Sequence, residues 1–136
     1  MIGQKKKQNL LMMNIKLEKS IFKKILFFII MPILIKLERS KNPKKKWNAI
    51  FRLEGNKFKT VSFGSPKMED YLAHKDIERR DRYLKRHERD LRTNDPLRPG
   101  FLSYYLTWSG FKQKGKPTTS IPKLIRMYNN KFFKKK

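Results

Sequence analysis

The sequence predicts a small single α+β domain, in which a β-hairpin is covered by about three helices, with a basic and apolar N-terminal extension. Three observations lead to this prediction. The 136 residues are enough for one domain. Residues 47–63 alternate in polarity as paired strands do, and the segments after them show helical spacing of apolar residues. We expect the extension at residues 1–46, the domain at 47–133 and a basic tail at 134–136.

Residues 1–46 differ in composition from the rest, with 13 Lys/Arg and two acids. Their apolar segment, 21–35, contains a charge-free run (25–35) shorter than the roughly 17–25 residues of a transmembrane helix. No small-residue cleavage site follows, as a signal peptide would require. Three interpretations remain: an interfacial anchor making a peripheral membrane contact, a segment buried against the domain or a partner, and a poorly structured extension. We attribute the similarity of IKLEKS (15–20) to IKLERS (35–40) to coincidence.

The predicted hairpin begins at Trp47. Apolar residues alternate along its first strand, and Gly55-Asn56 then supplies a tight turn. Val61 and Phe63 continue the pattern on the second strand, whereas Phe58 is out of phase and predicts a bulge near it. The residues expected on one face of the first strand are Trp47, Ala49, Phe51 and Leu53. Because an isolated hairpin is marginally stable in water, helices must cover it.

Helices are predicted from capping residues and from apolar spacing. Ser65-Pro66 fits a helix start, and Asp76 fits the N-cap of a helix that begins near residue 77. Residues 101–108 are apolar on nearly every side, as in a short buried helix. A mobile basic loop precedes the last helix. The apolar stripe of that helix comprises Ile121, Leu124, Ile125, Tyr128 and Phe132.

The net charge limits the classes of partner. The formal charge is +24, so a folded monomer repels itself and an anionic partner is expected: nucleic acid, acidic protein or anionic lipid. The alternative is a merely soluble basic protein. The chain has no cysteine, which excludes disulfides and thiolate zinc sites. Seven of the ten arginines fall between Arg79 and Arg98, so a binding surface is sought there.

Residues 74–92 read HKDIERRDRYLKRHERDLR and hold both histidines, eight Lys/Arg and five Asp/Glu. On a helix, Ile77, Leu84 and Leu91 fall within about 40° of one another and predict a seam that faces the core. Much of the charge has a structural explanation, since four pairs place an acid four residues before a base. These pairs are Asp76–Arg80, Glu78–Arg82, Asp81–Lys85 and Glu88–Arg92.

A row of arginines is not explained by these pairs. Arg79, Arg86 and Arg89 have no acid four residues before them, and with Arg82 they lie within about 80° on the helix side away from the seam. Guanidinium groups bind phosphate oxygens in a bidentate manner, so such a row suits a nucleic-acid backbone. Four aromatic residues offer surfaces for base stacking, although their spacing is more typical of a core. They are Tyr83, Tyr104, Tyr105 and Trp108.

Catalysis is not indicated by the sequence. His74 and His87 are thirteen residues apart, about 20 Å along one helix, so they cannot ligate one metal ion. No nucleophile is paired with either histidine by spacing, and no glycine-rich phosphate loop is present. We therefore expect no enzyme activity, metal, cofactor or small-molecule substrate. An enzymatic role would require a cleft that holds His87 beside a carboxylate.

Five motifs in order resemble a known family: TVSFGS, DYLAHKD, ERRDRYLKRH, NDPLRPGFLSYYLTW and SIPKLIRMYNNKF. They are similar to small basic proteins of unknown function encoded by nucleocytoplasmic large (giant) DNA viruses. The similarity covers residues 47–133 and leaves 1–46 outside. In that family proline often follows HKD; Ile77 stands there in this chain, which supports a helix start at that position. The resemblance implies a viral protein, in the virion or in the virus factory of the infected-cell cytoplasm.

Together these observations predict a non-enzymatic protein that binds nucleic acid by its phosphate backbone, without sequence specificity. The expected contacts are Arg79, Arg82, Arg86 and Arg89, assisted by Lys112, Lys114 and Lys116. The alternative is a minor capsid or membrane-associated structural protein of the virion. In that case the arginines would meet an acidic virion protein and residues 21–35 would touch lipid.

Overall fold

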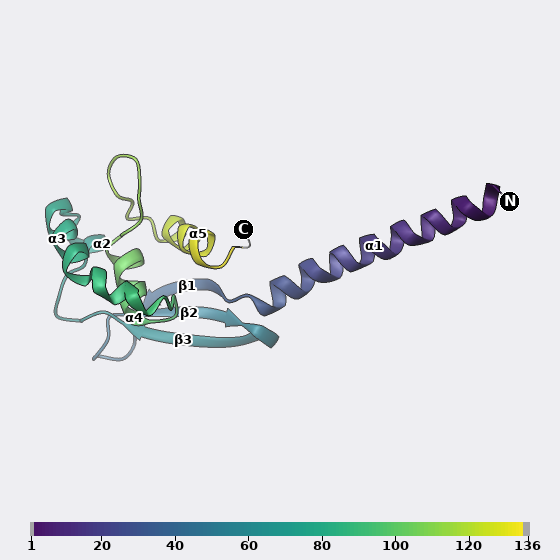
Figure 1. Ribbon diagram of the computed structural model, residues 1–136. Coiled ribbons are helices and arrows are strands. Elements are labelled where there is room, and N and C mark those ends of the chain that lie inside the picture. Colours follow the sequence, from purple (N-terminus) through teal and green to yellow (C-terminus); the bar gives the residue numbers. More distant parts are fainter. Residues whose placement is uncertain (1, 135–136) are drawn as a thin grey trace.

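The predicted α+β class is confirmed by the computed structural model, which describes the backbone of residues 2–134 and the side chains of 3–26 and 31–134. A three-stranded antiparallel sheet is covered on one face by helices. A long N-terminal helix, α1 (Ile2–Ile30), extends away from the domain on the side opposite α3 (Figure 1). In the described part of the chain, no helix has both the length and the apolar character needed to cross a membrane.

The predicted hairpin is confirmed as β2 (Trp47–Leu53) and β3 (Lys57–Phe63), which pair without interruption from Trp47↔Phe63 to Leu53↔Lys57. Gly55 and Asn56 both have positive φ in the turn η1 (Glu54–Asn56). The bulge expected near Phe58 is wrong: the register is regular there, and Phe58 lies on the open face of the sheet, 66% exposed. Phe58 is therefore out of phase with the buried residues of β3 because its side chain faces solvent, and not because the strand is irregular.

The first strand of the sheet is one that the sequence did not reveal. β1 (Ile33–Arg39) pairs with β2, and Leu34 and Leu37 are buried in the core. The domain boundary expected at residue 47 is therefore wrong, because the sheet begins at residue 33. A register shift between Leu34 and Lys36 breaks the alternation, so two buried leucines stand three residues apart. That spacing resembles a helix and conceals the strand.

The apolar segment 21–35 is divided between two elements, so its treatment as one segment is wrong. Residues 21–26 belong to α1 and are exposed, whereas residues 33–35 belong to β1. The side chains of residues 27–30 lie outside the described residues. The basic residues 41–46, assigned to the extension, form the β1–β2 loop and thus belong to the domain.

Short helices connect the sheet to the last helix. They are α2 (Tyr71–His74), α3 (Ile77–His87), the 3-10 helix η2 (Glu88–Thr93), α4 (Pro99–Leu102) and the π-helical turn η3 (Ser103–Thr107), and the last helix is α5 (Ile121–Phe132). The helix start expected at Ser65-Pro66 is wrong, since residues 64–70 are not helical and the next helix begins at Tyr71. The Asp76 N-cap is confirmed: its Oδ1 accepts the Arg79 backbone N–H at 3.2 Å.

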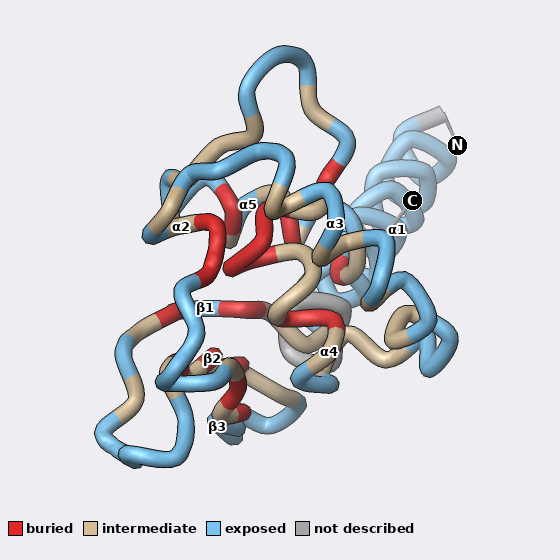
Figure 2. Tube along the Cα trace, turned by 90° about the vertical axis from the view of Figure 1, so that its left-hand side faces the viewer, coloured by how far each residue is buried: buried red, intermediate tan, exposed pale blue. Residues whose placement is uncertain are grey.

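The core lies between the sheet and the helices α4, η3 and α5. Figure 2 shows the buried segments of the strands and of these helices gathered together. The predicted stripe on α5 is confirmed, with Leu124 and Tyr128 fully buried. The Asn129 side chain adds a polar link to β1, because its amide accepts from the Leu34 N–H at 2.8 Å and donates to the Leu34 carbonyl at 2.9 Å. This link satisfies both backbone groups beside the register shift.

Candidate nucleic-acid interface

Helix α3 docks on the domain through a different face from the one the sequence predicts. Ile77 is 40% exposed and no residue of α3 is fully buried, so the seam of Ile77, Leu84 and Leu91 does not face the core. The residues that touch the domain are Arg80 and Tyr83, followed by His87 at the helix end. Polar and aromatic contacts replace the aliphatic contacts that we expected.

A column of stacked rings makes the aromatic part of this contact. The ring of Tyr83 lies between those of His87 and Trp108, with centroids 4.1 Å and 3.9 Å away and interplanar angles of 25° and 5°. Burial raises the pKa of Tyr83 above its ordinary value, so the phenol stays neutral. Since both faces of Tyr83 are covered and Trp108 is buried, these two rings form packing contacts and offer no free surface to a base.

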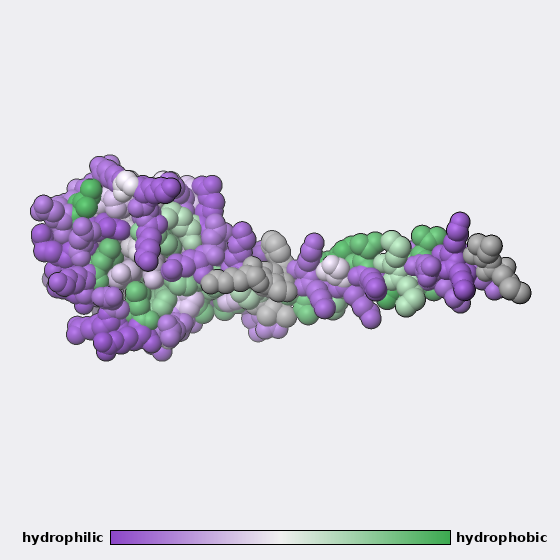
Figure 3. All heavy atoms as spheres, turned by 45° about the horizontal axis from the view of Figure 1, so that its top comes forward, coloured by the Kyte–Doolittle hydropathy of each residue, from purple (hydrophilic) through white to green (hydrophobic). Residues whose placement is uncertain are grey.

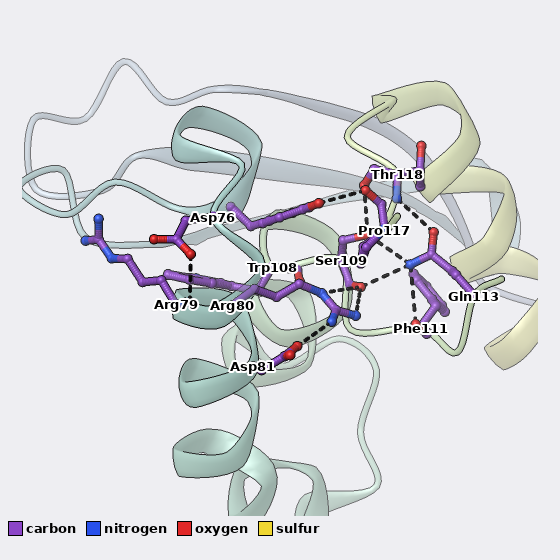
Figure 4. Close-up of polar contacts among 11 residues, drawn as sticks. Asp76, Arg79, Arg80, Asp81, Trp108, Ser109, Phe111, Gln113, Pro117 and Thr118 are labelled. Carbon is purple, nitrogen blue, oxygen red and sulfur yellow. Dashed lines mark hydrogen bonds and ion pairs between the residues drawn. The ribbon is translucent and has the colours of Figure 1, made fainter. Parts of the chain in front are cut away.

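Arg80 makes the polar part of the contact. Its side chain is only 11% exposed. The guanidinium donates from Nε to the Trp108 carbonyl at 3.1 Å and from Nη2 to the Ser109 carbonyl at 2.8 Å, and Nη1 pairs with Asp81 at 2.8 Å. In Figure 4, Arg80 points toward these carbonyls while Arg79 points the opposite way. Arg80 therefore satisfies the backbone at the end of η3 and is not available for a ligand.

The ion pairs expected along the helix are replaced by others. None of the four pairs with an acid four residues before a base forms an ion pair in the described part of the chain. Asp76 caps α3 and Asp81 binds its neighbour Arg80. Intrahelical pairing therefore does not neutralise the basic side of this segment.

The predicted row of arginines lies at the surface. Arg82, Arg86 and Arg89 are exposed and Arg79 is half-buried. None of the four has a side-chain hydrogen bond or ion pair with another described residue. The α-helix ends at His87, which has φ −102° and ψ 5°, so Arg89 stands on the following 3-10 helix, η2. The row thus continues across a change of helix type.

Two hollows meet at Arg86. One, of ≈ 440 Å³, lies between the β1–β2 loop and the end of α3, and Lys44, Lys45 and Arg86 line it. The other, of ≈ 680 Å³, runs along the outer side of α3 and η2 and has four cations on its walls against one acid, Glu88. The first hollow is also lined by Glu69 and by Asp70, which pairs with Lys46. We call the other lysines and arginines of the two hollows the basic track: Lys44, Lys45, Lys85, Arg86, Arg89 and Arg92.

The lysines of the basic track were not identified from the sequence. Lys44 and Lys45 are distant from α3 in the sequence, and we had assigned them to the extension. Antiparallel pairing of β1 with β2 brings their loop to the end of α3. Lys46, in the same loop, has a structural role: its Nζ pairs with the buried Asp70 at 3.4 Å and donates to the Met68 carbonyl at 3.1 Å.

The loop with Lys112, Lys114 and Lys116 lies on another flank of α3. Lys112 and Lys116 line a hollow together with Ile77, Arg80 and Asp81, residues that point away from the arginine row. All three lysines are exposed. Gln113 braces the loop, since its amide donates to the Ser109 carbonyl at 3.2 Å and accepts from the Thr118 N–H at 2.9 Å (Figure 4). The structure therefore does not bring these lysines together with the four arginines.

The two histidines have different surroundings. His74 Nδ1 accepts the Asp76 N–H at 2.9 Å, and burial, followed by the nearby positive charge of Arg79, lowers the pKa of His74. His87 Nδ1 lies 2.9 Å from Asp90 Oδ2, and His87 lines the ≈ 440 Å³ pocket. The fold thus supplies the pair of a histidine and a carboxylate that an enzyme would need.

None of the hydroxyl groups that line the same pocket has a hydrogen bond to His87 in the described part of the chain. Thr107 Oγ1 donates to the Ser103 carbonyl at 3.2 Å, and Ser103 shares a hydrogen bond with Tyr83. The third, Ser65 Oγ, accepts the Lys67 N–H at 3.4 Å. Among the described residues of this pocket, none is therefore placed as a nucleophile that His87 activates.

Comparison with known proteins gives one similarity. Residues 35–87 match a family of unknown function (DUF5754). The match covers less than half of the chain, from β1 to the end of α3, and includes Arg79, Arg82 and Arg86. It begins within β1, ahead of the boundary we had expected at residue 47. No curated protein and no solved structure matches the chain.

Proposed function

We propose that this chain binds nucleic acid through the phosphate backbone, without reading the base sequence and without chemistry. The observation that carries the proposal is the exposed row of Arg82, Arg86 and Arg89, which no described acid neutralises, on a chain of charge +24. An unpaired guanidinium keeps its hydrogen-bond donors available, and phosphate oxygens match their geometry.

The basic track extends this row around the end of α3. Because Arg86 borders both hollows, a strand lying along η2 and α3 would reach Lys44 and Lys45 across the first hollow, which Glu69 and Asp70 also line. Each phosphate that a cation neutralises releases counterions, so affinity comes mainly from charge and falls with salt. Glu88 lines the outer hollow together with four cations and limits its net charge.

Sequence-independent binding follows from what the basic track lacks. Base recognition requires side chains that reach base edges or rings with a free face. Tyr83 is covered on both faces, and the residues of the basic track are lysines and arginines on an outer surface. The resemblance of five ordered motifs to giant-virus proteins adds a viral origin to this proposal, with the genome in the virion or the virus factory as the polyanion.

The salt dependence of binding tests the proposal. We expect the full chain to bind duplexes of unrelated sequence equally, with log K falling linearly against log salt at a slope of about −4 to −5, from about five phosphate contacts. Fluorescence anisotropy between low and physiological salt measures the slope. If poly-glutamate of matched charge displaces the duplex completely, the partner is an acidic protein of the virion and the nucleic-acid proposal fails.

The absence of chemistry is tested at the pair of His87 and Asp90. We expect labelled DNA and RNA incubated with the chain, with and without Mg²⁺, to remain intact, since no hydroxyl group of the pocket is hydrogen-bonded to His87 among the described residues. Cleavage that the His87→Asn variant abolishes, while it still binds the duplex, would make the chain a nuclease and reject this part of the proposal.

A further inference from the structure

Helix α1 presents a large apolar surface to solvent. It contains 29 residues, about 43 Å of helix, and meets the domain at the hairpin turn η1. Ten of its large apolar side chains are 41–64% exposed, which is unusual for a soluble monomer. They are Leu10, Leu11, Met12, Met13, Ile15, Leu17, Ile21, Phe22, Ile25 and Leu26. Figure 3 shows this hydrophobic surface along the projecting helix, beside hydrophilic side chains.

Most apolar residues of α1 and the lysines of its second half occupy different halves of the helix. At 3.6 residues per turn, eight of the ten apolar residues, all except Met12 and Met13, lie within about 180°. The lysines among residues 15–26 occupy the opposite half: Lys16, Lys19, Lys23 and Lys24. Lys7, Asn14 and Glu18 interrupt the apolar half. This arrangement is typical of a helix that lies in the plane of a membrane interface.

The apolar and basic surface of α1 could be covered by a second copy of the helix, by nucleic acid or by an anionic bilayer, and the charges of α1 distinguish these three partners. Residues 3–26 hold seven lysines and one acid, Glu18. A second copy packed against the apolar half would bury Glu18 in a dry seam, which is costly without a partner, and would leave the lysines on the outside without anionic partners. Nucleic acid would use the lysines and leave the apolar half in water. An anionic bilayer contacts both halves: the apolar residues meet the acyl chains and the lysines meet lipid phosphates, while Asn14 and Glu18, near the middle of the apolar half, limit insertion to the headgroup boundary.

We propose that α1 lies along the surface of an anionic lipid bilayer. Its apolar half enters the boundary between headgroups and acyl chains, and its lysines contact lipid phosphates. The surface is not the 21–35 segment that the sequence suggested, because β1 occupies residues 33–39 within the sheet. The proposal stands independently of nucleic-acid binding. Helix α3, which carries part of the basic track, lies at the end of the domain away from α1 (Figure 1), so the two surfaces are separate.

A matched pair of phenylalanine variants tests the apolar half. Phe22 on α1 is 64% exposed and Phe58 on the open face of the sheet is 66% exposed. In co-sedimentation of the full chain with phosphatidylcholine–phosphatidylserine vesicles, we expect Phe22→Gln to lower the partition coefficient about tenfold and Phe58→Gln to leave it unchanged. Both variants should keep the wild-type melting temperature, because neither side chain is in the core. Equal partitioning of the two variants would overturn the proposal.

The basic half is tested with lipid charge. We expect partitioning to fall at least tenfold when phosphatidylserine is omitted, and the variant with Lys16, Lys19, Lys23 and Lys24 changed to Gln to lose this preference. Equal binding of the wild type to neutral and anionic vesicles would overturn the role of the lysines. Sedimentation equilibrium without lipid tests whether a second copy of the chain covers the apolar half of α1 instead. A dimer that the Phe22→Gln variant dissociates, together with no binding to vesicles, would reject the bilayer as the partner of α1.

Discussion

Replacing Arg79, Arg86 and Arg89 together by glutamine weakens duplex binding by about 100-fold near 0.1 M salt and makes the salt slope shallower by about 2.7, or 0.9 for each lost phosphate contact. None of the three side chains has a hydrogen bond or ion pair with another described residue, so folding should be unaffected within about 0.5 kcal/mol. Fluorescence anisotropy measures the affinity and the slope, and urea denaturation measures the stability.

The control for this triple variant removes the same charge from another place. Changing Lys112, Lys114 and Lys116 to glutamine also lowers the net charge by three, but these exposed lysines lie on a different flank of α3. We expect a loss of less than tenfold, because distant charges act only through the screened field. If both triple variants lose the same affinity, the binding depends on net charge and the arginine row is not the interface.

The parts of the fold that the sequence predicts are those decided by neighbouring residues. Gly55-Asn56 sets the hairpin turn, Asp76 caps α3, and the stripe around Leu124 and Tyr128 faces the core. Each depends on residues a few positions apart, where turn chemistry, capping and periodicity have a direct physical basis. The exposure of the arginine row is likewise a local feature of one helix.

The features that the sequence did not predict depend on contacts across long separations. IKLEKS is helical at residues 15–20, whereas the nearly identical IKLERS is strand at 35–40 apart from its final serine. Local propensity cannot separate them; the second lies against β2 and receives the Asn129 amide from 95 residues away. The docking face of α3 was missed for the same reason. Its partners are a ring and two carbonyls near residue 108, which no periodicity within α3 reveals.

Replacing Arg80 by glutamine lowers the free energy of unfolding by about 2–4 kcal/mol, the largest effect on stability that we expect from a single arginine. The guanidinium is nearly buried and donates to the carbonyls of Trp108 and Ser109. Glutamine is shorter and cannot donate to both, so a carbonyl at the end of η3 loses its partner. Ser109 keeps one donor, the Gln113 amide, which sets the upper limit of the loss.

Arg79 is the natural control, because it is adjacent in the sequence and points the opposite way (Figure 4). We expect Arg79→Gln to keep the wild-type midpoint in urea and to weaken DNA binding, and Arg80→Gln to lower the midpoint and, while folded, to bind DNA nearly as well as the wild type. Equal midpoints for the two variants would show that water replaces the guanidinium at the carbonyls. Opposite phenotypes at adjacent arginines would show that direction on the helix, and not charge alone, decides which arginine stabilises the fold and which meets the phosphate.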